Sequence, residues 1–233
     1  MVEIDKIYNE DCLEGMKRIP DKSIDLIVTD PPYLLETNGG GIYNQADKQY
    51  VKELEDIRDG FRTEILDEMC RVMKQINIYL FCSQKQIIPL TDYFVTKRGC
   101  NWNLLSWHKD NPVPACGNKY LTDTEYLLFF REKGVKVFGD FNTKKKYWLQ
   151  EINVGDKHKW GHPTIKPLNI IRNLIVNSSL IGESVLDPFI GSGTTAIACI
   201  KEDRHFIGFE INKDYYESAC KRIEWERRQL KLF

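Results

Sequence analysis

The stretch Ile24-Asp25-Leu26-Ile27-Val28-Thr29-Asp30-Pro31-Pro32-Tyr33 gives the strongest structural signal in this sequence. Residues 24–29 form a short apolar run, which is typical of a strand buried in a parallel sheet. The two prolines lack a backbone N–H, so the strand must end there. A carboxylate, a stiff turn and an aromatic ring therefore lie at the carboxyl end of a strand, where open α/β sheets bind ligands. Such a site suits a planar base that carries an exocyclic amine.

Short apolar runs alternate with amphipathic segments along the rest of the chain, which indicates an α/β sheet with parallel pairs. The expected strands are 4–8, 24–29, 77–82, 102–107, 125–130, 184–186 and 205–210, and the expected helices are 11–19, 58–74, 84–98 (entered near Pro89), 168–180, 192–202 and 214–230. Glycines at 39–41 make 37–50 a candidate mobile loop, and 131–160 show no clear period. We expect one catalytic domain over residues 1–233, with a small insert at 131–160.

Charge is unevenly distributed on a chain whose formal net charge is only −1. Residues 1–60 carry 14 acidic and 7 basic side chains, whereas residues 131–159 carry 8 basic and 4 acidic ones. This basic stretch includes Lys144-Lys145-Lys146-Tyr147-Trp148 and indicates either a surface that faces a polyanion or a solvated loop.

The seven cysteines include no C-x-x-C pair, which predicts reduced thiols in a cytosolic protein, with neither a disulfide framework nor a zinc site. The acidic N-terminal segment lacks the long apolar run of a signal peptide. No apolar run approaches the 18 residues of a membrane span, so we expect no membrane partner.

A second motif, Leu186-Asp187-Pro188-Phe189-Ile190-Gly191-Ser192-Gly193-Thr194-Thr195, follows an expected strand and opens an expected helix. Its glycines permit a tight turn and close approach of a ligand to the backbone. Glu210 ends the next strand and is placed to hold ribose hydroxyls. The dinucleotide fingerprint lacks its third glycine, and Asp187 would repel a pyrophosphate, which disfavours a nicotinamide oxidoreductase. S-adenosylmethionine, with its ammonium and sulfonium, fits this turn better.

Together the two motifs resemble those of the amino-group (N6-adenine and N4-cytosine) DNA methyltransferases of bacteria and phages, over nearly the whole chain. The catalytic motif comes first here, as in the β group of that family. The resemblance implies a Rossmann-like, circularly permuted methyltransferase fold. Its sheet would have seven mostly parallel strands in the order 3-2-1-4-5-7-6, with one antiparallel strand. The first and last strands of this chain would then be neighbours.

The resemblance also assigns roles to individual residues. Asn9-Glu10-Asp11-Cys12-Leu13 is similar to the segment whose Asp contacts the cofactor adenine, and His162–Pro167 is similar to the group's H-P-T-x-K-P motif. The catalytic residues would be Asp30, Pro31, Pro32 and Tyr33. The cofactor residues would be Asp11, Cys12, Asp30, Thr164, Lys166, Asp187, Pro188, Phe189, Gly191, Ser192, Gly193, Thr194, Glu210 and Ile211. The DNA-binding residues would be Lys144, Lys145, Lys146, Tyr147 and Trp148.

The expected reaction moves a methyl group from S-adenosylmethionine to an exocyclic amine of a flipped-out base. Hydrogen bonds from the amine to the Asp30 carboxylate and the Pro31 carbonyl would localise its lone pair, and Tyr33 would stack on the base. Asp rather than Ser at position 30 favours adenine over cytosine in the family's pattern. The alternatives are an N4-cytosine enzyme and a non-catalytic S-adenosylmethionine-binding DNA module.

Several side chains also have plain structural interpretations. The alternative for Asp11 is a helix N-cap, for Thr164 and Lys166 it is loop surface, and for Tyr147 and Trp148 it is packing within the insert. Trp107, His108 and Asn111 line the base pocket or pack at a strand end. The insert is short, so we expect little direct base reading from it. The expected partner is double-stranded DNA in the cytoplasm of a bacterium or of a phage-infected host. The resemblance is also compatible with a homodimer and with a cognate restriction endonuclease.

Overall fold

The computed structural model describes residues 2–31, 62–112, 117–118, 120–152, 154–160 and 165–230. The expected loop at 37–50, the catalytic candidates Pro32 and Tyr33, and the cofactor candidate Thr164 lie outside the described residues.

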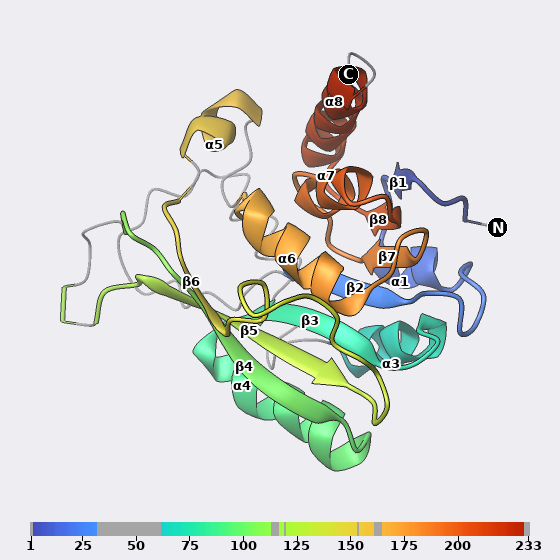
Figure 1. The fold of residues 1–233 in the computed structure, drawn as a ribbon. Coiled ribbons are helices and arrows are strands. Elements are labelled where there is room, and N and C mark those ends of the chain that lie inside the picture. The colour runs from blue at the N-terminus through green and yellow to red at the C-terminus, as the bar shows by residue number, and fades with distance from the viewer. Residues whose placement is uncertain are drawn as a thin grey trace.

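The described strands form one sheet in the order β1-β8-β7-β2-β3-β5-β4-β6 (Figure 1). Neighbouring strands are parallel except at β5, which runs against both β3 and β4. The strands are β1 (Lys6–Tyr8), β2 (Leu26–Thr29), β3 (Asn77–Cys82), β4 (Asn101–His108), β5 (Thr124–Arg131), β6 (Tyr147–Leu149), β7 (Ser184–Asp187) and β8 (His205–Phe209). From β1 to β4 this is the predicted order 3-2-1-4-5-7-6, so that prediction is confirmed.

The prediction of seven strands was wrong, because β6 adds an eighth. This strand comes from the segment expected to be an insert without periodic structure. It pairs in parallel with Ser106–His108, the last three residues of β4, which would otherwise form the open edge of the sheet. Three residues are too few to show a period, so tertiary pairing rather than local pattern makes this strand.

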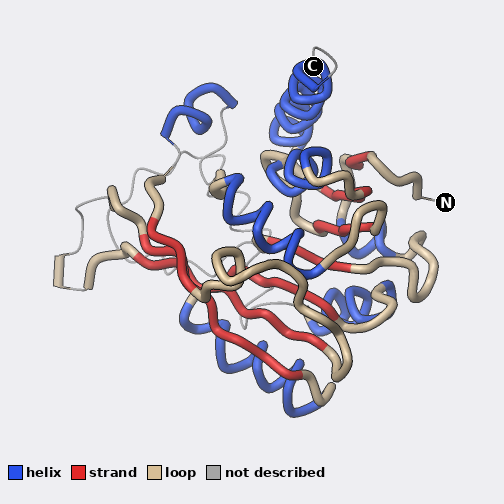
Figure 2. The backbone as a smooth tube through the Cα atoms, viewed as in Figure 1, coloured by secondary structure: helices blue, strands red, loops and turns tan. Residues whose placement is uncertain are grey.

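Helices cover both faces of the sheet (Figure 2). One face carries α1 (Cys12–Met16), α3 (Thr63–Val72), α4 (Gln84–Thr91) and the π-helix η1 (Asp92–Lys97). The other carries α6 (Leu168–Ser178), α7 (Thr194–Lys201) and α8 (Lys213–Leu230). The short helix α5 (Val154–Trp160) lies outside these two layers (Figure 1), and the ring of its Trp160 lies 6.2 Å from that of Trp225 on α8.

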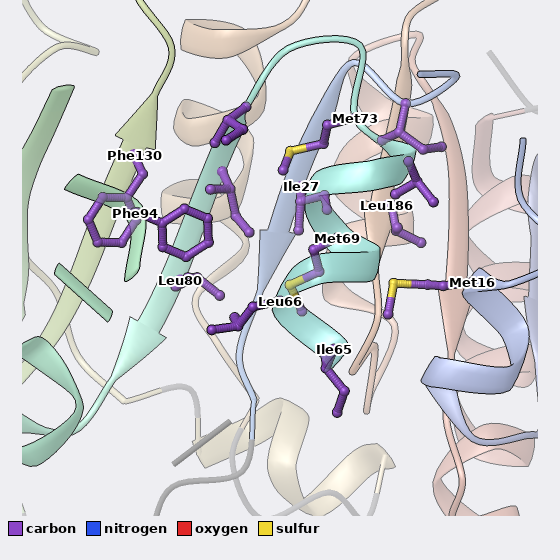
Figure 3. Packing of buried hydrophobic residues seen from close by; sticks show 14 of the residues in the cluster. Met16, Ile27, Ile65, Leu66, Met69, Met73, Leu80, Phe94, Phe130 and Leu186 are labelled. Atoms are coloured by element: carbon purple, nitrogen blue, oxygen red, sulfur yellow. The ribbon is translucent and has the colours of Figure 1, made fainter. Parts of the chain in front are cut away.

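The two central strands are buried on both faces, which explains why their sequences read as continuous apolar runs. Figure 3 shows the core on the first face, where Met69 of α3 packs among Ile27, Leu80 and Leu186 of three neighbouring strands. Phe94 stacks on Phe130 of β5, with ring centroids 4.5 Å apart. These contacts fix the central strands and hence the edge at which they end.

The expected helix over 84–98 begins at a cap and not near the proline. Ser83 is the N-cap, and the Gln86 side chain accepts a hydrogen bond from the Ser83 N–H at 2.8 Å, completing a capping box. Pro89 lies inside α4, and the helix widens into η1 from Asp92.

The first and last strands of the chain are neighbours, as the resemblance implied. β1 pairs in parallel with β8, with Lys6 opposite Ile207. The Glu210 N–H donates to the Tyr8 carbonyl at 3.0 Å, so the segments that follow β1 and β8 leave the sheet side by side. The permuted connection therefore leaves the sheet continuous.

Candidate active site

Three acidic residues follow parallel strands and meet at one edge of the sheet. Asp187 is the last residue of β7, while Asp30 and Glu210 directly follow β2 and β8. Because β8, β7 and β2 are parallel neighbours, their carboxyl ends share that edge. The structure thus brings together the predicted catalytic residue and two predicted cofactor residues.

The Asp187 carboxylate is buried inside the glycine turn that it opens. It accepts hydrogen bonds from Thr29 Oγ1 at 2.7 Å, Thr195 Oγ1 at 2.6 Å and the Phe189 N–H at 3.1 Å. Burial raises the pKa of Asp187 to about 6. Gly193 adopts a left-handed conformation (φ 78°) as the turn enters α7. The turn is thus fixed by hydrogen bonds of its own residues and by Thr29 of β2.

A buried arginine from the last helix braces the same turn. Arg222 Nη1 donates to the Ser192 carbonyl at 3.0 Å and to Thr194 Oγ1 at 2.9 Å, while its Nη2 lies 3.6 Å from Asp156 of α5. No sequence motif marks this arginine. Its one signal was its place on the buried face of α8, between Ala219 and Glu226.

Glu210 is buried where β8 ends. Its Oε1 accepts a hydrogen bond from the Asn212 N–H at 2.7 Å, and burial raises its pKa to about 7. Asn9 Nδ2 donates to the backbone carbonyls of Glu210 and Ile211 at 2.8 and 3.1 Å. The N-terminal segment is therefore tied directly to the predicted ribose-binding acid.

Asp11 caps helix α1, as its plain structural interpretation required. Its Oδ1 accepts from the Leu13 N–H at 2.9 Å and the Glu14 N–H at 3.2 Å. Cys12 is part of the core, where burial raises the pKa of its thiol to about 12. Ile211 is exposed beside Glu210.

Asp30 belongs to a buried network of charges that the sequence did not reveal. Lys166 Nζ bonds Asp30 Oδ2 and lies 3.2 Å from Glu125 Oε2 on β5. Glu125 in turn pairs with Lys109 at 2.9 Å, and Lys166 Nζ lies 5.0 Å from the centre of the Phe81 ring. Pro31 is buried beside this network. Lys166 is thus not loop surface, and the structure places it against the catalytic candidate.

The predicted DNA-binding segment lies at the far edge of the sheet. Lys144, Lys145 and Lys146 are exposed, and Tyr147 begins β6 with its side chain 59% exposed in the solvent. Trp148 is half-buried and packs against the core of the second face.

The candidates for the base pocket make structural contacts. Trp107 is buried and its Nε1 donates to the Gln150 carbonyl at 2.8 Å, while Asn111 Oδ1 accepts from the Ile152 N–H at 2.6 Å. His108 shares hydrogen bonds with Ser106 and Thr124. These contacts hold the segment after β6 against the sheet.

A profile of the DNA methylase family N6_N4_Mtase matches residues 24–221, which include both strand-end motifs. The chain belongs to this DNA methylase family. Among curated methylases it is 28% identical to the type II methyltransferase M2.MboI of Moraxella bovis, with 93% of this chain and 86% of the relative aligned. It is 29% identical to the type II methyltransferase M.HinfI of Haemophilus influenzae, over 94% of this chain and 68% of that relative.

Solved DNA methyltransferases share the fold of this methylase. The crystal structure of an M1.HpyAVI–SAM complex superposes with a TM-score of 0.67 at 26% identity, over 93% of this chain and 98% of that one. The cytosine-N4-specific PvuII DNA methyltransferase superposes with a TM-score of 0.70 at 17% identity, over 93% and 85% of the two chains. This second likeness concerns the fold alone.

The methylase uses S-adenosylmethionine, and its strand-end residues fit that cofactor. The buried carboxyl of Glu210 suits a pair of ribose hydroxyls, and the acids at this edge suit a ligand that carries an ammonium and a sulfonium. The left-handed Gly193 leaves the backbone of the turn without a side chain, and a Cβ there would lie only 3.3 Å from the Cβ of Ala219. Among the described residues no three potential ligands gather as a metal site, and no described helix is long and apolar enough to cross a bilayer.

Proposed function

We propose that this methylase modifies the N6 amine of an adenine rotated out of double-stranded DNA, with Asp30 and Pro31 holding the amine. The observation that carries the proposal is the Asp30 carboxylate, held at the end of β2 by the buried ammonium of Lys166. An ion pair fixes the carboxylate in its charged form, which accepts hydrogen bonds from an amine most strongly.

The residues around Asp30 have defined tasks in such a reaction. The lone pair of an aryl amine is conjugated with its ring, so the amine is a weak nucleophile. Two accepting oxygens, one from the Asp30 carboxylate and one from the Pro31 carbonyl, would draw the nitrogen toward tetrahedral geometry and localise the pair. S-adenosylmethionine, when bound, supplies the methyl group, and its sulfur keeps the electron pair of the broken S–C bond. The proton lost from nitrogen passes to Asp30 and then to water. Fixed geometry between the reacting groups supplies much of the acceleration.

Adenine is the proposed base because residue 30 is Asp, which favours adenine in the family's pattern. Pro32 and Tyr33 complete the proposed catalytic turn, with Tyr33 stacking on the base, and Thr164 is proposed at the cofactor. Lys144–Lys146, Tyr147 and Trp148 are proposed to contact the duplex within a target-recognition insert at 131–160. A homodimer, a cognate restriction endonuclease and a cytoplasmic location in a bacterium or phage host stay predictions.

The test is nucleoside mass spectrometry of duplex DNA treated with the purified protein and S-adenosylmethionine. The expected product is N6-methyladenine, and Asp30→Asn is expected to lower kcat at least about a hundredfold. Asp25→Asn is the matched control. Asp25 lies before the same strand at the opposite edge of the sheet, where it pairs with Lys74 at 2.7 Å. N4-methylcytosine without N6-methyladenine would overturn the base assignment. Full activity of Asp30→Asn would overturn the catalytic assignment.

A further inference from the structure

Four side chains of alternating charge run from the sheet edge into the active site. In order they are Lys109, Glu125, Lys166 and Asp30. They come from four separate segments, namely the residues that follow β4, the strand β5, the residues before α6 and the residues that follow β2. Only the assembled sheet places them in a row.

The middle of this row is deeply buried. The Lys166 side chain is 7% exposed, so its ammonium has little access to water. Burial alone lowers the pKa of Lys166, but the carboxylates of Asp30 and Glu125 outweigh burial and raise it. Burial likewise opposes ionisation of Glu125, yet the ammonium groups of Lys166 and Lys109 hold the pKa of Glu125 below its ordinary value. The Lys166 ammonium and the Glu125 carboxylate are therefore both charged at neutral pH.

Sharing of Lys166 between two carboxylates bears directly on the proposed reaction. Asp30 must accept hydrogen bonds from the substrate amine while it also contacts Lys166. An ammonium that bonded Asp30 alone would compete more strongly for its oxygens and withdraw more of its charge. Glu125 draws the same ammonium toward β5, which limits that competition.

We infer that Glu125 is a positioning residue for methyl transfer, which holds the Lys166 ammonium so that Asp30 keeps the orientation and charge that accept the amine. This inference rests on the proposed catalytic role of Asp30. Glu125 lies on β5 and acts through Lys166 rather than on the substrate. If Glu125 only stabilised the fold, its removal would change the unfolding temperature alone. A positioning role predicts that its removal also lowers the rate of methyl transfer.

The central experiment compares Glu125→Gln with Glu202→Gln. The two glutamate side chains are 19% and 18% exposed and each pairs with a cation, but Glu202 follows α7 at the opposite edge of the sheet, where Arg172 Nε holds it at 2.6 Å. Glu125→Gln is expected to lower kcat about tenfold or more with KM for DNA changed less than about twofold, whereas Glu202→Gln keeps both values. A kcat of Glu125→Gln within twofold of the wild type would overturn the inference.

Two further variants keep the test decisive if Glu125→Gln folds poorly. Glu125→Asp keeps the charge but shortens the side chain, and it should restore part of the lost kcat. The pair Glu125→Gln with Lys109→Gln removes one charge of each sign, so the buried Lys166–Asp30 pair stays balanced. It should lose kcat as much as Glu125→Gln alone, since Lys166 again has only one carboxylate. Wild-type kcat in the double variant would contradict the inference.

A readout without cofactor addresses Asp30 itself. The ¹³C resonance of its carboxyl, identified by its absence in Asp30→Asn, should shift in Glu125→Gln and stay in place in Glu202→Gln. Other titratable groups act on Asp30 as well, namely Lys166, Asp187 at the end of β7 and the Cys82 thiol of β3. The acid limb of the kcat–pH profile should move to lower pH in Glu125→Gln, because one negative charge near Asp30 is lost. If either the Asp30 carboxyl resonance or the acid limb of the kcat–pH profile did not move in Glu125→Gln, the result would argue that Glu125 has only a structural role.

The outcomes separate this inference from the proposed function. An active Asp30→Asn protein would remove the foundation of both. An inactive Asp30→Asn protein together with a fully active Glu125→Gln protein would leave the proposed function intact and reject the positioning role alone.

Discussion

Glu210 shows at the scale of one residue how a binding site lowers the stability of its own protein. Burial raises the pKa of its carboxyl from 4.5 to about 7, so the cofactor-free fold prefers the protonated form. Between those two pH values the folded protein holds a proton that the unfolded chain has released. Stability must therefore fall as pH rises through this window. A buried acid whose pKa is raised, at the end of a strand, is the kind of group that a ligand-binding role would explain, as proposed for Glu210.

Glu210→Gln should consequently make the cofactor-free protein more stable at pH 8, by on the order of 2–3 kcal/mol. The difference in stability between the two proteins should close as pH falls to about 4.5, where the side chain at position 210 is neutral in both folded proteins. Urea unfolding at pH 4.5 and pH 8 measures this difference. The same variant should bind S-adenosylmethionine at least about tenfold more weakly at pH 8, because it loses hydrogen bonds to a charged acceptor. Equal stability of the two proteins at pH 8 would contradict the argument.

The residues that the sequence revealed and those it did not differ in a physical way. Asp30 and Asp187 stand at strand ends marked by proline or glycine, and Glu210 ends the next strand after the glycine turn, so all three signals are local. Glu125 and Arg222 carry no such mark, since their partners lie far away in the chain. Lys166 is 41 residues from Glu125, and Ser192 is 30 residues from Arg222. Their roles follow from strand order and helix packing, which a single sequence does not display.

At the scale of elements, helix α1 lies directly on β8 because Gly15, the fourth of its five residues, has no side chain. A Cβ on Gly15 would lie 2.2 Å from Cε1 of Phe209, whose ring is fully buried. Glycine costs a helix about 1 kcal/mol relative to alanine, so its presence here needs a reason. The reason is close packing, which also brings the Asp11 end of the helix next to the end of β8.

Gly15→Ala should therefore destabilise the protein by about 1–2 kcal/mol, although alanine is the better helix former. Denaturant unfolding checks the sign, and weaker S-adenosylmethionine binding should accompany it because Asp11 and Glu210 would move apart. Glu14→Ala, on the exposed side of the same helix, is the control and should change stability by less than about 0.5 kcal/mol. A stabilised Gly15→Ala protein would show that helix propensity outweighs the contact.

Elements with an apolar pattern of their own were predictable, and elements in the segment without a period were not. β3 begins and ends where the sequence indicated, whereas β6 and α5 fall in a segment without a period. β6 exists because β4 offers it an open edge, and α5 is held by contacts with α8, including the Ser218 hydroxyl donating to the Trp160 carbonyl at 2.5 Å. Such elements depend on tertiary partners and not on a local pattern.

At the scale of the whole molecule, the predicted catalytic and cofactor acids lie at one edge of the sheet, where the parallel strands end. The strands β8, β7, β2, β3, β4 and β6 all end at the edge that carries Asp30 and Glu210. β6 pairs with the carboxyl-terminal residues of β4, and the Ser106 N–H donates to the Lys146 carbonyl at 2.9 Å, so the basic residues that precede β6 lie beside the middle of β4. The proposed contact between these lysines and the duplex would place the phosphate backbone along the side of the sheet that β6 forms.

The replacement of Lys144, Lys145 and Lys146 by alanine should weaken DNA binding and flatten its salt dependence. Each lost phosphate contact lowers the slope of log K against log salt by about 0.9, so three contacts predict a change of about 2–3. The control replaces three exposed lysines at the opposite edge and removes the same total charge. Lys6 opens β1, and Lys22 and Lys97 precede β2 and β4. Fluorescence anisotropy from 50 to 200 mM salt measures both slopes. Equal slopes for the two triple variants would mean that overall charge, and not the insert, attracts the duplex. A flatter slope for the 144–146 variant alone, with an unchanged product base, would show that these lysines position the duplex without reading its sequence.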